Sequence, residues 1–512
     1  MKLPHVQSIV QSLLAQSILL PFDIVFAQKH LAQASSSNAE AEAFLAAASA
    51  LLRCGYPYFA IHKDTINPTL PGVSNKLLFQ WFQALPSDTK EMLFEVVDNK
   101  IYLRSLFLLR EQVFQKLRIL AEATPRTPLY FKTISQLSEE QNFVLEQVLK
   151  SCFSLVCGGP GTGKTFLAAQ MIRSILAQIP SAQIVVASPT GKAAAHLQSV
   201  LASLGMIEGS VEVITIHKFL KDVRLGRSPV DLLLVDEGSM VTMNLLHGLI
   251  KTIRGELRGE RYFADRMVIF GDANQLPPIG IGVGNPFREV VTNFTEQTFV
   301  LSTSHRAKRK ELQDLAKAVL HKQPIPFQPL PSRQEAIRQL AAAFIHAVKE
   351  GVSLCALTPM RQGPWGFLQL NRLLFSEMQE KYPQAPIPII VTERYETWGL
   401  TNGDTGFLDP VTQQLHFMNG ETLHKNDFPY YSCNYVMSVH KSQGSEYPVV
   451  IIPLYNAPPM LMTRNLFYTA VTRAERMVIL VGRREIAEKM IENNRQSLRY
   501  TGLAKRLFMP EK

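Results

Sequence analysis

Residues 158–165 read Gly-Gly-Pro-Gly-Thr-Gly-Lys-Thr, between an apolar run at 153–157 and a stretch with helical composition at 166–179. This strand–loop–helix order is typical of a P-loop. Its glycines let backbone N–H groups turn toward phosphate oxygens, and the helix N-terminus adds positive potential. A glycine-rich turn without a ligand is the competing interpretation, but the flanking strand and helix disfavour it. The stretch therefore predicts a nucleotide site on a parallel α/β sheet.

Every residue of this loop is a candidate nucleotide contact: Gly158, Gly159, Pro160, Gly161, Thr162, Gly163, Lys164 and Thr165. In such a loop the lysine neutralises the β- and γ-phosphates and the last hydroxyl binds Mg²⁺, so these roles fall to Lys164 and Thr165. A second apolar run, 232–235, ends in Asp236 and Glu237. We expect Asp236 to hold Mg²⁺ through water and Glu237 to activate the attacking water. An acid after a strand is a weak signal alone, but together with the P-loop it predicts ATP and Mg²⁺ as cofactors.

The composition limits the class of protein. The chain has 512 residues, of which 46% are hydrophobic and 19% charged, which excludes a disordered chain and allows about three domains. A net charge of +10 suits a nucleic-acid partner, although many basic proteins bind none. The five cysteines form no CxxC pair, which disfavours a disulfide framework and a zinc ribbon. The N-terminus reads poorly as a signal peptide, and no apolar run is long enough for a membrane helix, so we expect a cytoplasmic protein without a membrane partner.

The chain divides into three parts by pattern. Residues 1–120 show helical periodicity, clearest at 39–53 and 103–121, and predict a helical N-terminal domain. Short apolar runs then alternate with helical stretches, which indicates parallel sheets. We expect a first α/β domain at 125–328 and a second at 335–512, with a proline-containing linker at 322–333 between them. The strand-like runs of the two domains are 153–157, 184–187, 232–235 and 267–270, then 354–357, 388–391, 435–439, 449–452 and 477–481.

Further segments suggest how the nucleotide could do work. Gln275, in the Gly-Asp-Ala-Asn-Gln-Leu-Pro-Pro stretch 271–278, follows a strand and could reach the γ-phosphate. Arg306 and Arg473 lie in polar settings, and an arginine supplied across a domain cleft can stabilise a transferring phosphate. Each signal has a simpler interpretation, a turn that ends a strand or a solvated arginine. The ordered set as a whole is the specific signal.

As an ordered set, these segments resemble the superfamily 1 helicases and, within them, the RecD family. The resemblance covers residues 137–483 and includes the P-loop, 188–194, 215–218, 235–240, 271–278, 439–446 and 468–474. In the acidic segment, Gly238 stands where the family usually has alanine, an exchange that we expect to be small. Gln141 occupies the position of the family's adenine-reading glutamine, and Arg306 and Arg473 match its motif arginines. Two stretches resemble the RecD family more narrowly, 361–366 and 402–406.

The resemblance implies two RecA-like P-loop motor domains behind the helical domain, with an SH3-like β insert at about 393–430 in the second motor. It implies an ATP-dependent 5′→3′ DNA helicase subunit of an exodeoxyribonuclease V complex that acts on single-stranded DNA and double-stranded ends in break repair and recombination. RecB-like and RecC-like partners are implied in the same way, with the N-terminal domain as the docking part or merely a cap over the motor. DNA contacts would fall to Pro189, Thr190, Lys192, His217 and His440. Two alternatives stay open, a stand-alone repair helicase and an ATP-dependent DNA-binding switch that does not translocate.

Overall fold

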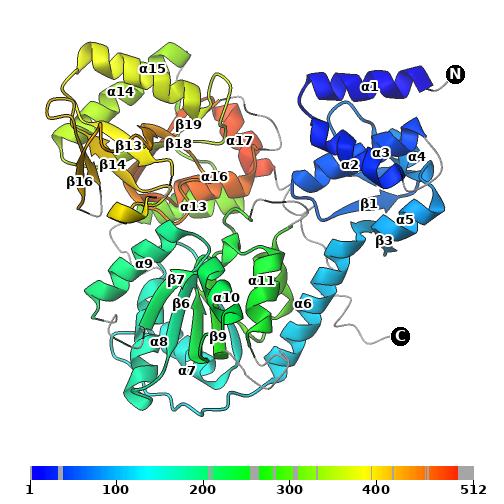
Figure 1. Cartoon of the computed structure of the whole chain (residues 1–512). Helices are drawn as coiled ribbons and strands as arrows, with labels where there is room; N and C mark the ends of the chain where they lie inside the picture. The colour runs from blue at the N-terminus through cyan, green and yellow to red at the C-terminus, as the bar shows by residue number, and fades with distance from the viewer. Residues whose placement is uncertain are drawn as a thin grey trace.

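The structure, a computed structural model, shows three parts that each combine helices and strands: an N-terminal domain and two larger α/β domains (Figure 1). It describes residues 3–32, 38–205, 209, 211–253, 264–278, 280, 284–303, 310–329, 332–393, 395–417, 420–455, 457 and 461–493. Among these residues, no helix combines the length and the apolar character needed to cross a membrane.

The N-terminal domain mixes helices and strands, in contrast to the helical domain that we expected. Its elements are α1 (Leu3–Ala15), α2 (Pro21–Leu31), α3 (Ala39–Arg53), β1 (Tyr58–His62), β2 (Thr65–Asn67), α4 (Asn75–Gln83), α5 (Ser87–Leu93), β3 (Phe94–Val97) and β4 (Lys100–Leu103). The strands form an antiparallel sheet in the order β2-β1-β4-β3. Helix α3, predicted at 39–53, is buried along most of its length because its many alanines let neighbouring elements approach closely. Periodicity missed the strands because each has only three to five residues.

Helix α6 (Arg104–Glu122) belongs to two cores. Near its start, Phe107 packs on Tyr102 of the N-terminal sheet. Farther along, Val113, Phe114 and Leu117 are buried in the core of the next domain, where α6 packs beside α11 (Met243–Lys251). Figure 1 shows the helix running from the N-terminal domain along the first motor. The boundary expected at residue 120 therefore cuts into a helix that serves both domains.

The first motor domain is built on a six-stranded parallel sheet in the order β10-β5-β9-β8-β6-β7. Helices α7, α8 and α9 cover one face, and α6, α10, α11 and α12 cover the other. The carboxyl ends of parallel strands share one edge, so the P-loop, the acids and the 188–194 and 271–278 segments converge there. The elements not yet placed are α7 (Glu139–Lys150), β5 (Phe153–Gly158), α8 (Lys164–Gln178), β6 (Ile184–Ser188), α9 (Gly191–Ser203), β7 (Val211–Thr215), α10 (Ile216–Arg224), β8 (Val230–Val235), η1 (Gly238–Met240), β9 (Ala264–Gly271), α12 (Pro286–Asn293) and β10 (Thr298–Leu301).

The second motor domain has a five-stranded parallel sheet in the order β11-β20-β19-β12-β18. Its elements are α13 (Lys310–His321), β11 (Gln328–Pro329), α14 (Arg333–Lys349), β12 (Leu354–Thr358), α15 (Phe367–Lys381), β18 (Val436–Ser438), β19 (Tyr447–Leu454), α16 (Arg464–Val471), β20 (Ala474–Gly482) and α17 (Arg484–Glu492). The linker expected at 322–333 is wrong. Leu315, Ala318 and Val319 of α13 are already in the second core, and the proline-containing stretch leads into β11.

An insert interrupts the second motor between α15 and β18. It is a five-stranded antiparallel sheet in the order β16-β15-β14-β13-β17, comprising β13 (Ile387–Val391), η3 (Glu396–Trp398), β14 (Thr405–Leu408), β15 (Gln414–Phe417), β16 (Thr422–His424) and β17 (Tyr431–Cys433). Its small core gathers around Phe428, Phe417 and Trp398. The insert is longer than the expected 393–430, because the run 388–391 is β13 of this sheet and not a strand of the parallel sheet. An apolar run alone does not reveal its partner strand.

Candidate nucleotide and DNA site

The P-loop has the backbone that its glycines permit. Gly161 and Gly163 have φ angles of 79° and 81°, in the left-handed region that favours glycine. A Cβ on Gly158 would stand 2.5 Å from Oγ1 of Thr162, so the loop closes tightly at the end of β5. Helix α8 starts at Lys164, directly after the loop, and its N-terminus is therefore turned to the site.

Lys164 is held by its own loop. Its Nζ donates hydrogen bonds to the carbonyl oxygens of Gly158, at 2.7 Å, and of Gly159, at 3.0 Å. The hydroxyl of Thr162 donates to the Gly159 carbonyl at 2.9 Å. The Lys164 ammonium is thus bound by the loop's own carbonyl oxygens. Phosphate oxygens would have to replace these carbonyls as its hydrogen-bond partners.

Gln141 braces the P-loop from α7. Its side chain is buried; Nε2 donates to the Thr162 carbonyl at 3.2 Å, and Oε1 accepts from the Ser138 N–H at 3.2 Å in a capping box. An amide has two N–H groups and two acceptor positions, so these two bonds by themselves do not prevent a contact with adenine. Reading of the base by Gln141 stays a prediction.

The two acids follow β8 at the same sheet edge. The N–H of Asp236 donates to the Ala187 carbonyl of β6 at 2.9 Å, and Glu237 adopts a left-handed backbone with φ 53°. Burial raises the pKa of Asp236 above its ordinary value, the neighbouring Glu237 carboxylate raises it further, and Lys164 opposes both. Asp236 is half-buried, and a divalent cation bound beside the P-loop would favour its ionised carboxylate.

Gly238 is tightly enclosed behind the acids. A Cβ there would lie 2.6 Å from Cγ2 of Ile269 and 2.9 Å from both the Phe270 carbonyl oxygen and Cδ2 of Phe287. The alanine that the family usually carries would not fit this packing without a shift of the neighbours. The glycine at position 238, where the family usually has alanine, therefore fits the close packing of its neighbours in this chain.

The 271–278 segment of the first motor docks on α16 of the second. Tyr468 donates from Oη to the Asp272 carboxylate at 2.8 Å, and the Leu276 N–H donates to Oγ1 of Thr469 at 2.9 Å. The amide of Asn465 donates to the Asn274 carbonyl at 2.7 Å. Burial raises the pKa of Asp272, and the nearby Lys164 opposes that rise. Sequence reasoning assigned no role to Asp272 or Tyr468. An aromatic residue inside a helix is usually a core residue, and the sequence does not show that Tyr468 contacts Asp272 in the other domain.

A cavity of about 430 Å³ between the motors collects most of the predicted catalytic residues. Its lining includes Lys164, Thr165, Asp236, Glu237 and Gln275 from the first motor, and Ser445 and Arg473 from the second. Arg473 is held by the Thr469 carbonyl at 3.2 Å and the Ser445 carbonyl at 3.3 Å. Arg306 lies outside the described residues.

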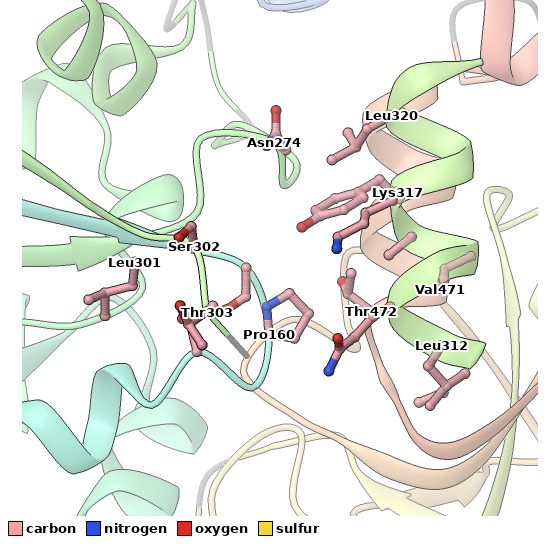
Figure 2. Close-up of a pocket in the computed structure, with 16 residues that line it drawn as sticks. Pro160, Asn274, Leu301, Ser302, Thr303, Leu312, Lys317, Leu320, Val471 and Thr472 are labelled. Atoms are coloured by element: carbon pink, nitrogen blue, oxygen red, sulfur yellow. Dashed lines mark hydrogen bonds between the residues drawn. The ribbon is translucent and has the colours of Figure 1, made fainter. Parts of the chain in front are cut away.

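A second cavity, of about 410 Å³, lies on the other side of Pro160. Figure 2 shows Pro160, Ser302 and Thr303 of the first motor facing Leu312 and Lys317 of α13. Val471, the last residue of α16, and Thr472, which follows it, lie beside them. The walls combine apolar and polar groups, as expected of a pocket for a nucleoside. The P-loop thus lies between two cavities: the first contains Asp236 and Glu237, and the second has both apolar and polar walls.

The residues expected to contact DNA lie around α9, α10 and β18. Thr190 caps α9 by accepting the Ala193 N–H at 3.2 Å, while His217 is exposed on α10 and His440, after β18, is half-buried. Lys192 is half-buried: burial lowers its pKa, and Cys355 and Asp404 of the second motor oppose that shift. Pro189 is half-buried at the end of β6. Of these residues, Lys192 lies near groups of the second motor, and a shared DNA path along all five stays a prediction.

Comparisons with known proteins agree with this geometry. The AAA domain family matches residues 136–343, and the UvrD-like helicase C-terminal domain family matches residues 434–481. The RecBCD enzyme subunit RecD of Mycolicibacterium smegmatis is 29% identical, covering 96% of this chain and 98% of that protein. The RecD subunit of Haemophilus influenzae is 23% identical over 89% and 83%. The ATP-dependent RecD2 DNA helicase of Deinococcus radiodurans is 27% identical over 66% of this chain but 48% of its own length.

Among solved structures, a Bacteroides Pif1 helicase in complex with ADP-AlF3 and ssDNA aligns with 73% of this chain and 98% of its own, at 15% identity and a TM-score of 0.46. The full-length matches are to RecD subunits, and the two family matches place the halves of a helicase motor in the order found here. The chain is similar to RecD subunits over almost its whole length, and its two family matches indicate a superfamily 1 helicase.

Proposed function

We propose that the chain is the ATP-driven DNA helicase subunit of a RecBCD-type exodeoxyribonuclease V complex, acting in the cytoplasm on DNA ends during break repair and recombination. The observation that carries the proposal is the cavity that joins Lys164, Glu237 and Gln275 of one motor to Arg473 of the other. Nucleotide bound there would contact both motors, so its hydrolysis would change their separation.

The chain's own residues fit a magnesium–nucleotide complex. Thr165 and Asp236 line the same cavity, and Oε1 of Gln275 is buried without a hydrogen-bond partner among the described residues. Thr165 and Asp236 would hold Mg²⁺, which would offset the negative charge of the phosphates. A buried acceptor such as Gln275 would orient a water molecule at the γ-phosphate.

The remaining roles follow from position. Lys164 would leave the carbonyls of Gly158 and Gly159 for the phosphates, and Glu237 would accept the proton of the attacking water. Arg473 would stabilise charge on the transferring phosphate from the second motor, and Arg306 would join it. The second cavity, at Pro160 and Thr303, would take the nucleoside.

DNA would lie across both motors, along Pro189, Thr190, Lys192, His217 and His440, with 5′→3′ movement. The coverage of whole RecD subunits, against half of the longer RecD2 helicase, favours a complex with RecB-like and RecC-like subunits over a stand-alone helicase. The N-terminal domain would dock on such a partner. The antiparallel insert would correspond to the SH3-like part of the second motor.

The test has two parts. Purified chain with ATP and Mg²⁺ should unwind a duplex that carries a 5′ single-stranded tail, and should leave a duplex with a 3′ tail intact. ATP hydrolysis without strand separation on either substrate would favour the non-translocating switch. Tagged chain isolated from its native cells should bring RecB-like and RecC-like subunits with it, and its isolation alone would favour the stand-alone helicase.

A further inference from the structure

Two neighbouring residues at the start of α7 hold two different loops of the nucleotide site. Gln141 binds the P-loop through the Thr162 carbonyl. Glu140 binds the chain that leaves β10: its carboxylate accepts the Ser302 N–H at 2.9 Å, the Ser302 hydroxyl at 2.7 Å and the Thr303 N–H at 3.2 Å. The helix start is itself fixed by the Ser138 capping box. The first turn of α7 is thus a common anchor for both loops.

Ser302 and Thr303 begin the chain's passage from the first motor to the second. Strand β10 ends at Leu301, which pairs with Gly158 at the mouth of the P-loop, and α13 of the second core begins at Lys310. Ser302 and Thr303 also line the cavity of Figure 2, opposite α13. Glu140 therefore fixes the point where the interdomain connection leaves the nucleotide pocket.

The chemistry of this anchor requires a carboxylate. All three partners are donors, and only an ionised carboxyl group offers enough acceptor positions on both oxygens. Burial alone would raise the pKa of Glu140, but the bonds from Ser302 and Thr303 outweigh burial and lower it. A glutamine of the same shape would turn an N–H₂ group toward donors. The site is therefore selective between two side chains of equal size.

We propose that Glu140 is a positioning residue for the motor: it holds the first-motor end of the interdomain connection so that nucleotide entering beside Pro160 moves α13 and the second motor. This inference rests on the proposed function. Without the bonds to Glu140, Ser302 and Thr303 could shift in the wall of the cavity that faces α13, so nucleotide would bind more weakly and close the motors less. The simpler explanation is an acid at a helix N-terminus, which the helix dipole favours anywhere in the first turn.

The experiment compares Glu140→Gln with Glu139→Gln. Glu139 is an exposed acid in the same turn, so its substitution removes the same charge from the same helix end. Affinity for the non-hydrolysable analogue AMP-PNP with Mg²⁺ is measured by calorimetry. Closure is measured by energy transfer between dyes at Leu225 and Val411, which are 75% and 67% exposed.

Glu140→Gln should weaken AMP-PNP about three- to tenfold and reduce the nucleotide-induced change in energy transfer, because charge-assisted bonds are lost. Glu139→Gln should match the wild type in both. Ser302→Ala removes one of the three donors, so its AMP-PNP affinity and its change in energy transfer should lie between those of the two glutamine variants. This variant provides the test if Glu140→Gln folds poorly. A merely structural role would lower the fraction of active protein but leave affinity and closure of that fraction unchanged, which would overturn the proposal. A wild type that binds AMP-PNP and closes but does not unwind DNA would instead contradict the proposed function.

Discussion

Lys164 and Glu237 illustrate how a single residue sets one step of the cycle. Lys164→Ala should abolish DNA-stimulated ATP hydrolysis, because the phosphates would lose the positive charge that the P-loop itself supplies, and Arg473 lines the cavity from the other motor. Glu237→Gln should keep ATP binding but hydrolyse very slowly, because the amide cannot accept the proton of water. Binding is measured by calorimetry and turnover by phosphate release. Turnover near the wild-type rate in Glu237→Gln would remove it from the role of base.

The raised pKa of Asp236 predicts a pH dependence. A carboxyl group with a raised pKa is still partly protonated at mildly acidic pH, where an ordinary aspartate is ionised. Magnesium-dependent nucleotide affinity should therefore fall as the pH is lowered from about 8 toward about 5, because protons compete with the cation for the carboxylate. Titration of AMP-PNP at several pH values, with and without Mg²⁺, checks this. Asp236→Asn should bind weakly at every pH, and an unchanged slope in that variant would assign the dependence to another group.

Much of this site was predictable at the level of residues. Lys164, Thr165, Asp236, Glu237, Gln275 and Arg473 line one cavity, as the order of strands and loops suggested. The bonds of Gln141 within its own helix and loop were not predictable, because they depend on the angle at which α7 meets the P-loop. The same limit applies to the Tyr468–Asp272 bond, which joins two domains.

At the scale of elements, the enclosed backbone of η1 makes Gly238 a test of packing. Gly238→Ala should destabilise the protein by about 1–3 kcal/mol, because its Cβ would overlap Ile269 and Phe287 at the fixed junction of β9 and α12. Gly191→Ala is a matched control, since a Cβ at the start of α9 has nothing within 4 Å. Thermal denaturation of both variants gives the comparison. Equal midpoints would mean that the neighbours of Gly238 yield freely.

Helices with a clear hydrophobic periodicity were predicted well, but the elements that they pack against were not. Helix α3 lies at 39–53 as predicted, and α6 lies within a residue of its predicted limits. Amphipathicity shows that one face of α6 is buried but not in which core, and the two ends of the helix enter different ones. Helix α13 shows the same ambiguity, since it precedes the proline-containing stretch yet packs in the second motor.

For the whole molecule, the shared helix decides where the N-terminal domain can be removed. A chain that starts at Arg104 should fold and hydrolyse ATP but no longer co-purify with RecB-like and RecC-like subunits. A chain that starts at residue 121 should aggregate, because it loses the buried Val113, Phe114, Leu117 and Leu120, worth about 8–20 kcal/mol together. That loss is comparable to the whole free energy of unfolding of a typical domain, about 5–15 kcal/mol. Assembly of the chain from Arg104 into the complex would show that the domain is a cap and not a docking part.

The double membership of α6 also affects how the chain is made. On a ribosome, residues 104–122 emerge before α11, which packs beside them and ends about 130 residues later. At roughly 5–20 residues per second, that delay is on the order of ten seconds. Through this time the N-terminal half of the helix can already pack on its finished sheet, while the apolar side chains of the other half await a partner still being synthesised. Translation speed between α6 and α11 is therefore expected to influence the yield of native protein.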